Sequence, residues 1–301
     1  MLRTVTAGLD GSPESRAAAE WAAREARLRG LPLKIVHVRE PLPVPVAQAP
    51  LVGTETLQSW AENLPRESAE GIALRHPGVE VTGELLTGRP ADLLTEQADA
   101  CELLVLGSRG LGGVRGFLLG SVGLRVLART RRPVVLVRAG EQAADEHRMD
   151  PAGVPSAAAP FKPVVLGLDA EDPDETLLGF AFDSAARRAA PLRVVHGWSL
   201  PPTYEYAVAV GYDPRDTFGR HMAAGLAEVL RPWRQKHPDV EVIEAGRNRT
   251  PASALVEAAD DASLVVVGRR IRDGAPGPHL GHVTHAVLHH AHAPVAVVPH
   301  A

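Results

Sequence analysis

The sequence predicts an α/β protein made of two tandem copies of a doubly wound, open, parallel five-stranded sheet. Short apolar runs alternate with alanine-rich stretches in each half, and the second half repeats the first. Such alternation is typical of a parallel sheet covered by helices on both faces. The length of 301 residues also exceeds that of a single-core domain and suits two domains.

The repeat has a spacing near 160 residues. TVTAGLDGSPES near the start returns as VVLGLDAEDPDE, and RRPVVLVR returns as HAPVAVVP. Other paired positions are Asp10 with Asp169, His37 with His196, His76 with His237, and Gly107 with Gly268. The spacing is 159 for the first two pairs and 161 for the last two, so the second copy has gained two loop residues between them. Self-similarity over this many segments indicates a duplication.

The stretch between the copies, AGEQAADEHRMDPAGVPSAAAPFKP, has small, polar and proline residues and no apolar periodicity. This composition is typical of a linker. The prediction is a first domain over residues 1–140, a linker over 141–160 and a second domain over 161–301.

Five strands are expected in the first copy. In chain order they are Thr4–Leu9, Leu33–Val38, Val79–Leu86, Leu103–Leu106 and Val134–Val137. Four of them are almost wholly apolar, as expected for strands that are buried on both faces. The third, VEVTGELL, alternates more between apolar and polar residues and is predicted to lie nearer an edge of the sheet.

Charge and composition argue against several classes of protein. A net charge of −4 gives no electrostatic support for nucleic-acid binding. The N-terminal MLRTVTAGLDGS lacks the apolar core of a signal peptide, and no apolar run is long enough for a transmembrane helix. The single cysteine, Cys101, can form no internal disulfide, so we expect a cytoplasmic protein with no membrane partner. Nothing around Cys101 suggests a lowered pKa, so we expect a core or surface residue rather than a nucleophile.

The most informative segment for function is GSRGLGGVRGFLLGSV, from Gly107 to Val122, between a strand end and a helix start. Glycines let successive N–H groups point at one anion, and a helix that starts at Ser121 favours negative charge at its N-terminus. Arg109 and Arg115 add cations. The segment predicts a phosphate site, and the alternative is a flexible surface loop followed by a serine N-cap.

Two common phosphate motifs are absent from this segment. No lysine precedes Ser121, which argues against a P-loop ATPase. The G-x-G-x-x-G pattern that begins at Gly110 fails at Arg115, which argues against a dinucleotide-binding dehydrogenase.

The spacing present is G-x2-G-x9-G-S, formed by Gly107, Gly110, Gly120 and Ser121. In this motif the chain resembles the ATP-binding members of the universal stress protein family. Asp10 after the first strand, HV at the end of the second and PVVLV in the last extend the resemblance over nearly all of the first copy.

The resemblance implies an adenine nucleotide alpha-hydrolase-like fold with strand order 3-2-1-4-5, and bound ATP accompanied by Mg²⁺. It implies that Asp10 meets the adenine or the ribose. The base pocket would be lined by the main chain at Gly8, Val38 and Leu106. Ribose and phosphates would be held by Gly107, Gly110, Gly120, Ser121 and Val122. No catalytic residue is assigned.

Asp10 also stands out without the resemblance. Asp10 and Gly107 each follow an apolar strand, and ligands of open parallel sheets bind at strand carboxyl ends, where the winding direction reverses. The alternative role is capping, because LDGSPES predicts a turn into a helix with Ser12 or Asp10 as the cap and Pro13 at the first helical position. The two roles are compatible.

The second copy departs from the motif. Ile271 replaces the middle glycine, His282 replaces the serine, and the loop contains Pro276 and Pro278. An isoleucine does not readily adopt positive φ, and each proline removes an N–H group. LDAEDPDE also has acidic residues where the family has small polar ones. We therefore expect one functional nucleotide site per chain, in the first copy.

Histidines are dense near the C-terminus, between His279 and His292. On a helix that starts near His282, this residue, His285 and His289 would share a face. Three imidazoles there could bind zinc or copper, or form a pH-sensitive surface. Because no H-E-x-x-H motif or cysteine assists them, we expect a solvated face and no metal site.

The expected function is that of an ATP-binding sensor in stress or regulation. The motif provides a phosphate cradle but no evident base for an attacking water, so slow ATP hydrolysis is the most we expect. One alternative is an interaction module that binds no nucleotide. Another is a nucleotidyl-transfer or pyrophosphatase relative, which would need a HIGH-type or SGGxDS-type signature that this sequence lacks.

The expected partners are an adenine nucleotide and an unidentified protein. The two copies are expected to pair within the chain through the edges VVLVR and VAVVP, as a dimer of the family would. A homodimer of whole chains is a further option.

Overall fold

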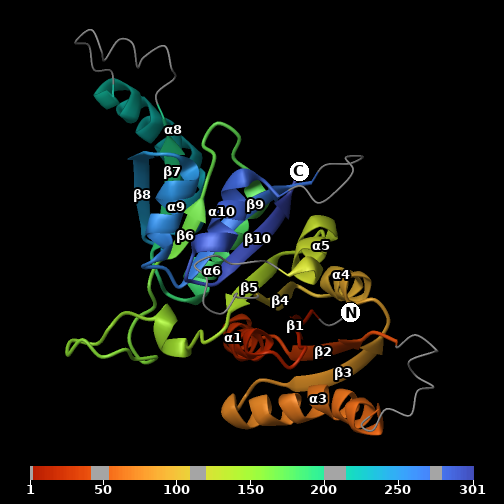
Figure 1. Ribbon diagram of the computed structural model, residues 1–301. Helices are drawn as coiled ribbons and strands as arrows, with labels where there is room; N and C mark the ends of the chain where they lie inside the picture. Colours follow the sequence, from red (N-terminus) through yellow and green to blue (C-terminus); the bar gives the residue numbers. More distant parts are fainter. Residues whose placement is uncertain (1–2, 42–53, 109–119, 200–214, 272–279) are drawn as a thin grey trace. The chain divides into compact units, whose positions relative to one another are not determined.

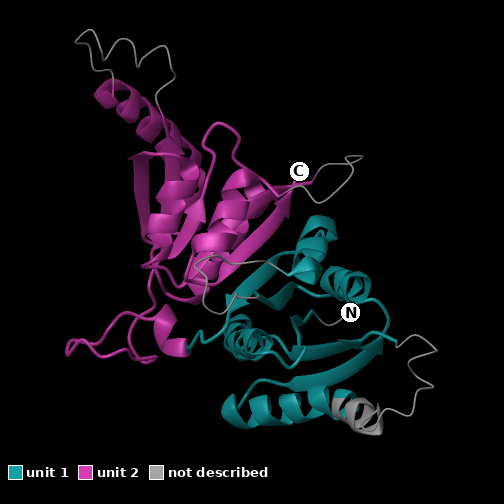
Figure 2. Ribbon diagram, in the orientation of Figure 1, with its two compact units in different colours: residues 1–142, 275–279 teal, residues 143–274, 280–301 magenta. Residues whose placement is uncertain are grey.

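The computed structural model describes residues 3–41, 54–108, 120–199, 215–271 and 280–301. These residues form two compact units, shown in teal and magenta in Figure 2. The first unit contains the described residues up to Gln142, and the second contains those from Ala143 onward. Each unit has its own parallel five-stranded sheet, so the predicted fold class is confirmed (Figure 1).

The sheet of the first unit has the expected topology. Its strands are β1 (Val5–Gly8), β2 (Leu33–Arg39), β3 (Val81–Thr87), β4 (Leu103–Ser108) and β5 (Val134–Arg138). Neighbouring strands are parallel and follow the order β3-β2-β1-β4-β5. The order 3-2-1-4-5 is therefore confirmed. The alternating strand β3 lies at one end of this order and is partly exposed, whereas β1 is buried throughout.

Helices cover both faces of this sheet (Figure 1). They are α1 (Pro13–Arg29), α3 (Thr54–Arg75), α4 (Pro90–Ala100) and α5 (Ser121–Arg129). Helix α1 begins where the sequence predicts, because the hydroxyl of the N-cap Ser12 accepts a hydrogen bond from the Ser15 amide at 3.2 Å and Pro13 occupies the first position. It ends at Gly30, whose φ of 64° allows the left-handed cap.

The core of the first unit consists of strand side chains packed against small residues of α1. Val5 and Leu104 have no exposed surface, and neither have Ala18 and Ala22 on the helix. Full burial of one valine or leucine side chain contributes about 1.5–3 kcal/mol. Alanines at the contact let the helix approach the sheet closely, and this approach brings its first turn to the end of β4.

The second unit repeats the same topology. Its strands are β6 (Val164–Gly167), β7 (Leu192–Trp198), β8 (Val242–Asn248), β9 (Leu264–Arg270) and β10 (Val295–His300). Its helices are α6 (Glu175–Arg187), α8 (Arg215–Lys236), α9 (Pro251–Ala259) and α10 (His282–His290). The parallel order β10-β9-β6-β7-β8 is the order of the first sheet, counted from the unit's own strands. None of the described helices is long and apolar enough to cross a membrane.

Residues 143–161, which span most of the predicted linker, are folded onto the second unit. They start with a 3₁₀ turn over Ala143–Glu146. His147 then forms an antiparallel bridge with Phe161, and the two ring centroids lie 4.0 Å apart. The guanidinium of Arg188 lies 5.8 Å from the centre of the Phe161 ring. This segment is therefore anchored by ring packing as well as by main-chain bonds.

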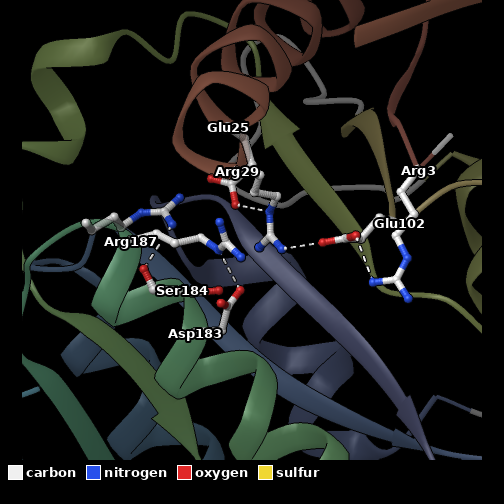
Figure 3. Close-up of polar contacts among 8 residues, drawn as sticks. Arg3, Glu25, Arg29, Glu102, Asp183, Ser184 and Arg187 are labelled. Atoms are coloured by element: carbon white, nitrogen blue, oxygen red, sulfur yellow. Dashed lines mark hydrogen bonds and ion pairs between the residues drawn. The ribbon is translucent and has the colours of Figure 1, made fainter. Parts of the chain in front are cut away.

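Each unit also contains ion pairs that involve its first helix (Figure 3). In the first unit, Arg29 donates from Nε to Glu25 at 2.7 Å, and only 3% and 1% of these side chains are exposed. Glu102 lies 3.4 Å from the same guanidinium. In the second unit, Arg187 donates to Asp183 at 2.8 Å. A buried charge without a partner costs several kcal/mol, so the Arg29 pair constrains how α1 packs.

Candidate functional site

A cavity of about 320 Å³ lies in the first unit at the carboxyl ends of β1 and β4. It is lined by Gly8, Leu9, Asp10, Ser12, Ser15, Val36, Val38, Pro90, Leu94, Leu106, Gly107, Gly120, Ser121, Val122 and Gly123. All of the residues proposed from the sequence line it except Gly110. Gly110, Arg109 and Arg115 lie outside the described residues. The fold thus brings together segments that are far apart in the sequence, at the position where open parallel sheets bind ligands.

Asp10 stabilises the loop between β1 and α1. Its Oδ1 accepts hydrogen bonds from the Ser12 amide at 3.0 Å and the Ser12 hydroxyl at 2.5 Å. The Asp10 amide in turn donates to the hydroxyl of Ser15 at 3.2 Å. Of the two caps that the sequence allows, Ser12 is the one present, and Asp10 orders the turn in front of it. The Asp10 side chain is exposed at the edge of the cavity.

A buried histidine anchors the same loop from the neighbouring strand. His37 Nδ1 lies 2.7 Å from the main-chain oxygen of Leu9. A carbonyl oxygen only accepts, so the ring nitrogen is the donor and carries the proton. The second unit has the same bond from His196 to Leu168, at 3.1 Å. The sequence shows these histidines only as a repeated pair, because the bond joins residues 28 positions apart.

The start of α5 forms the opposite wall of the cavity. Gly120 is the N-cap and Ser121 is the first helical residue, so the alternative of a serine N-cap is wrong. The Leu124 amide donates to the Gly120 oxygen at 3.0 Å. The amides of Ser121, Val122 and Gly123 precede that bond, in the part of a helix whose N–H groups have no intrahelical partner. These residues line the cavity, where the positive end of the helix dipole favours an anion.

At two of the candidate glycines an added Cβ atom would come too close to neighbouring atoms. A Cβ atom on Gly107 would lie 2.6 Å from the main-chain carbon of Glu14 and 2.7 Å from the Ser15 nitrogen. A Cβ atom on Gly8 would lie 2.6 Å from the Leu106 side chain. Neither glycine has a positive φ. Gly107 therefore allows the first turn of α1 to approach β4 closely, whatever ligand the cavity takes.

The second unit has a threonine where the first has a glycine that lines the cavity. Thr284 occupies the position of Gly123 in the repeat, and Gly268 that of Gly107. The Thr284 hydroxyl donates to the Gly268 oxygen at 2.9 Å, and this residue is only 4% exposed. The threonine side chain therefore joins the helix start to the strand end, at positions whose counterparts, Gly107 and Gly123, line the cavity of the first unit. Sequence reasoning missed this pair because the glycine motif ends at Ser121.

The loop after β6 also differs from its counterpart. Helix α6 begins at Glu175 with Asp174 as N-cap, whereas Asp172 is the counterpart of the first residue of α1. Asp172 forms an ion pair with Arg270 at the end of β9. This ion pair therefore joins the end of β9 to the loop after β6.

Cys101 is not suited to nucleophilic chemistry. The residue is 4% exposed and its thiol lies 3.3 Å from the Ala98 oxygen. Burial raises the pKa of the Cys101 thiol from its ordinary value of 9.0 to about 11. The thiol is therefore protonated at neutral pH, and of the two predicted positions, core or surface, Cys101 occupies the core.

The histidine face predicted on the last helix is formed in part. His285 and His289 lie in contact on α10, with their Nε2 atoms 3.2 Å apart. No group of three or more potential metal ligands is found among the described residues, and His279 lies outside them.

Comparison with known proteins gives a consistent family. A model of the Universal stress protein family matches the chain twice, over residues 1–138 and 160–299. A universal stress protein of Mycolicibacterium smegmatis is 33% identical over 304 residues, covering 98% of this chain and 96% of the relative. One from Mycobacterium tuberculosis is 34% identical over 307 residues, covering 97% and 96%. The crystal structure of a universal stress protein from Archaeoglobus fulgidus has a TM-score of 0.68 at 18% identity, covers 98% of each chain and thus shares the fold.

Proposed function

The chain belongs to the universal stress protein family, and from this premise we propose that its first unit binds an adenine nucleotide, with ATP as the favoured ligand. In this proposal the second unit binds none. The observation that carries the proposal is the cavity of the first unit, whose lining combines a helix N-terminus, apolar side chains and one carboxylate.

The start of α5 suits the phosphates. The interaction of an anion with a helix N-terminus contributes about 0.3–1 kcal/mol at an exposed site and up to about 2 kcal/mol in a partly buried one. The hydroxyl of Ser121 adds a donor beside the amides of Val122 and Gly123. Mg²⁺ in proteins is commonly held by substrate phosphates with one or two carboxylates. Asp10 is the one carboxylate among the lining residues, so Mg²⁺ would bind mainly through the nucleotide and water.

The other end of the cavity suits the base and the ribose. Val36, Val38, Leu94 and Leu106 contribute apolar side chains to the lining. Ligand pockets typically combine such walls with a few polar groups that fix orientation. A carboxylate only accepts, so Asp10 suits a ribose hydroxyl or the adenine amino group. The family resemblance gives Asp10 the same role, and it lines the base pocket with the main chain at Gly8, Val38 and Leu106.

The proposed loss of the second site follows from Thr284. Thr284 is the counterpart of Gly123, and its hydroxyl donates to the oxygen of Gly268, the counterpart of Gly107, at the start of the helix that would meet a phosphate. Two charge-assisted hydrogen bonds lost at about 1.5–3 kcal/mol each would weaken binding by about a hundredfold or more. The sequence changes at Ile271 and His282 act in the same direction.

We propose a nucleotide-dependent sensor in stress or regulation rather than an enzyme. Asp10 Oδ1 already accepts two hydrogen bonds from Ser12, and the Cys101 thiol is buried and protonated. These groups are therefore poorly placed to activate water, and slow ATP hydrolysis is the most that the site supports. The alternative function is that of a protein-interaction module, for which we would expect no ATP binding in the cavity.

Calorimetric titration of the nucleotide-free full chain with ATP and Mg²⁺ tests the proposal. We expect a stoichiometry near one per chain. Gly120→Val should abolish binding, because the new side chain enters the phosphate end of the cavity. The matched control is Gly281→Val, at the same position of the second unit. Both glycines have φ and ψ values that valine tolerates, −59° and 149° for Gly120 and −57° and 151° for Gly281, so both variants should fold.

Three outcomes of this titration distinguish one nucleotide site per chain from two sites and from none. Binding that is lost in Gly120→Val and kept in Gly281→Val supports a single site in the first unit. A stoichiometry near two, halved by either variant, would show that the second unit also binds. No heat of binding at high protein concentration would favour the interaction module.

A further inference from the structure

Two histidines of α10 form a pair on the surface of the second unit. His285 and His289 are one helical turn apart, and their Nε2 atoms lie 3.2 Å from each other. The ring centroids are 4.2 Å apart, with an angle of 36° between the ring planes. His285 is exposed and His289 is half-buried, so an ion from solvent can reach the pair. The nucleotide proposal gives this pair no role.

The distance between the two nitrogen atoms matches that in a metal chelate. Zn²⁺ binds imidazole nitrogen at about 2.0–2.1 Å, and ligand angles between about 90° and 109° then place two nitrogens about 2.8–3.4 Å apart. The observed 3.2 Å lies inside this interval. We propose that His285 and His289 bind one divalent transition-metal ion of the zinc class through their Nε2 atoms. Imidazole prefers zinc, copper and nickel, whereas magnesium and calcium prefer oxygen ligands.

The ligand count defines the kind of site. Within the described part of the chain no third histidine, cysteine or carboxylate completes the pair into a larger metal-holding group. Water would therefore fill the remaining positions, and the site is weaker than a structural zinc site with four protein ligands. Each ring must carry its proton on Nδ1 so that both Nε2 lone pairs face the metal. Without metal, an Nε2 proton on one ring can be shared with the other.

The proposed site depends on the folded helix. The i, i+4 spacing brings the two rings together only while α10 is helical. A metal that binds the folded state more tightly than the unfolded chain raises the midpoint of thermal unfolding. This rise gives a second readout, independent of nucleotide.

The test is a titration of the full chain, without an affinity tag, with Zn²⁺ alone in a buffer that contains Mg²⁺. We expect one equivalent that binds at least about tenfold more weakly in His285→Ala and in His289→Ala, with loss of the zinc-dependent rise in the thermal midpoint. The matched control is His290→Ala, because His290 is exposed on the same helix with its ring centroid 6.4 Å from that of His289.

His290→Ala should keep both the zinc affinity and the thermal shift. Unchanged zinc affinity in His285→Ala or His289→Ala overturns the proposal. An equal loss in His290→Ala also overturns it, since the binding would then come from histidine density and not from the pair. Circular dichroism without metal should show the same helicity in the three variants as in the unchanged protein.

Discussion

The Nδ1 atom of His37 donates a hydrogen bond to the main-chain oxygen of Leu9, 2.7 Å away, and thereby joins β2 to the loop that carries Asp10. His196 and Leu168 repeat this bond in the second unit at 3.1 Å. Both histidines are buried. The bond is present in both copies although Thr284 stands in the second copy where the first has Gly123, so we assign the bond to the scaffold that the two copies share.

Replacing each histidine by phenylalanine separates its structural role from its functional one. His37→Phe and His196→Phe should each destabilise the protein by about 1–3 kcal/mol, because a buried carbonyl loses its donor. Only His37→Phe should also weaken ATP binding, by about tenfold, since Asp10 follows Leu9 directly. Urea unfolding and calorimetry measure the two effects. Equal ATP affinity in both variants would show that the loop needs no support from His37.

Thr284 predicts the effect of a side chain at Gly123. Gly123→Thr should reduce ATP affinity by about a hundredfold or more, because the new side chain would stand at the helix start that lines the proposed phosphate end of the cavity. Thr284→Val is the control. It should cost about 1–2 kcal/mol of stability through the lost hydrogen bond and leave ATP affinity unchanged. Full ATP binding by Gly123→Thr would contradict the proposed basis of the degenerate site.

Gly107 is predicted to be required for folding as well as for binding. Gly107→Ala should destabilise the first unit, by about 1–3 kcal/mol, because the new Cβ atom would overlap main-chain atoms of Glu14 and Ser15. Gly225→Ala in α8 should instead stabilise the protein by up to about 1 kcal/mol, since nothing lies within 4 Å of its Cβ position. Chemical denaturation of both variants gives the comparison. An unchanged free energy of unfolding in Gly107→Ala would contradict this prediction, because it would mean that α1 can move away from β4 to make room for the methyl group.

The Cys101 thiol predicts a loss of stability at high pH. Its pKa is raised from 9.0 to about 11 in the folded protein, so the folded state favours the protonated thiol. The stability that the protonated Cys101 thiol contributes is fully present below pH 9. It is lost as the pH rises through about 11, where the thiol of the folded protein also ionises. Cys101→Ala should remove this part of the pH dependence between pH 9 and 11. The unfolding free energies of both proteins, measured over that range, test it.

Much of the fold could be predicted because strands and repeats are local patterns in the sequence. The apolar runs predicted the strands of the first unit, and the alternation in β3 predicted its place at an edge of that sheet. The glycine spacing selected Gly120 and Ser121, which do line the cavity. The role of Thr284 could not be predicted, because it depends on how close a helix start lies to a strand end. The ligand roles of all the candidate residues stay predictions, and Gly110 also lies outside the described residues.

The folded segment before β6 determines how the two copies can be produced separately. A recombinant fragment that begins at Phe161 would lack His147, the ring against which this phenylalanine packs. It would also lose the hydrogen bond from the Lys162 amide to the Glu146 oxygen, at 2.9 Å. A fragment that contains the second copy should therefore start at or before Ala143. It then keeps the contacts of His147 and Glu146, and the Phe161 ring is not left exposed, where it would favour aggregation.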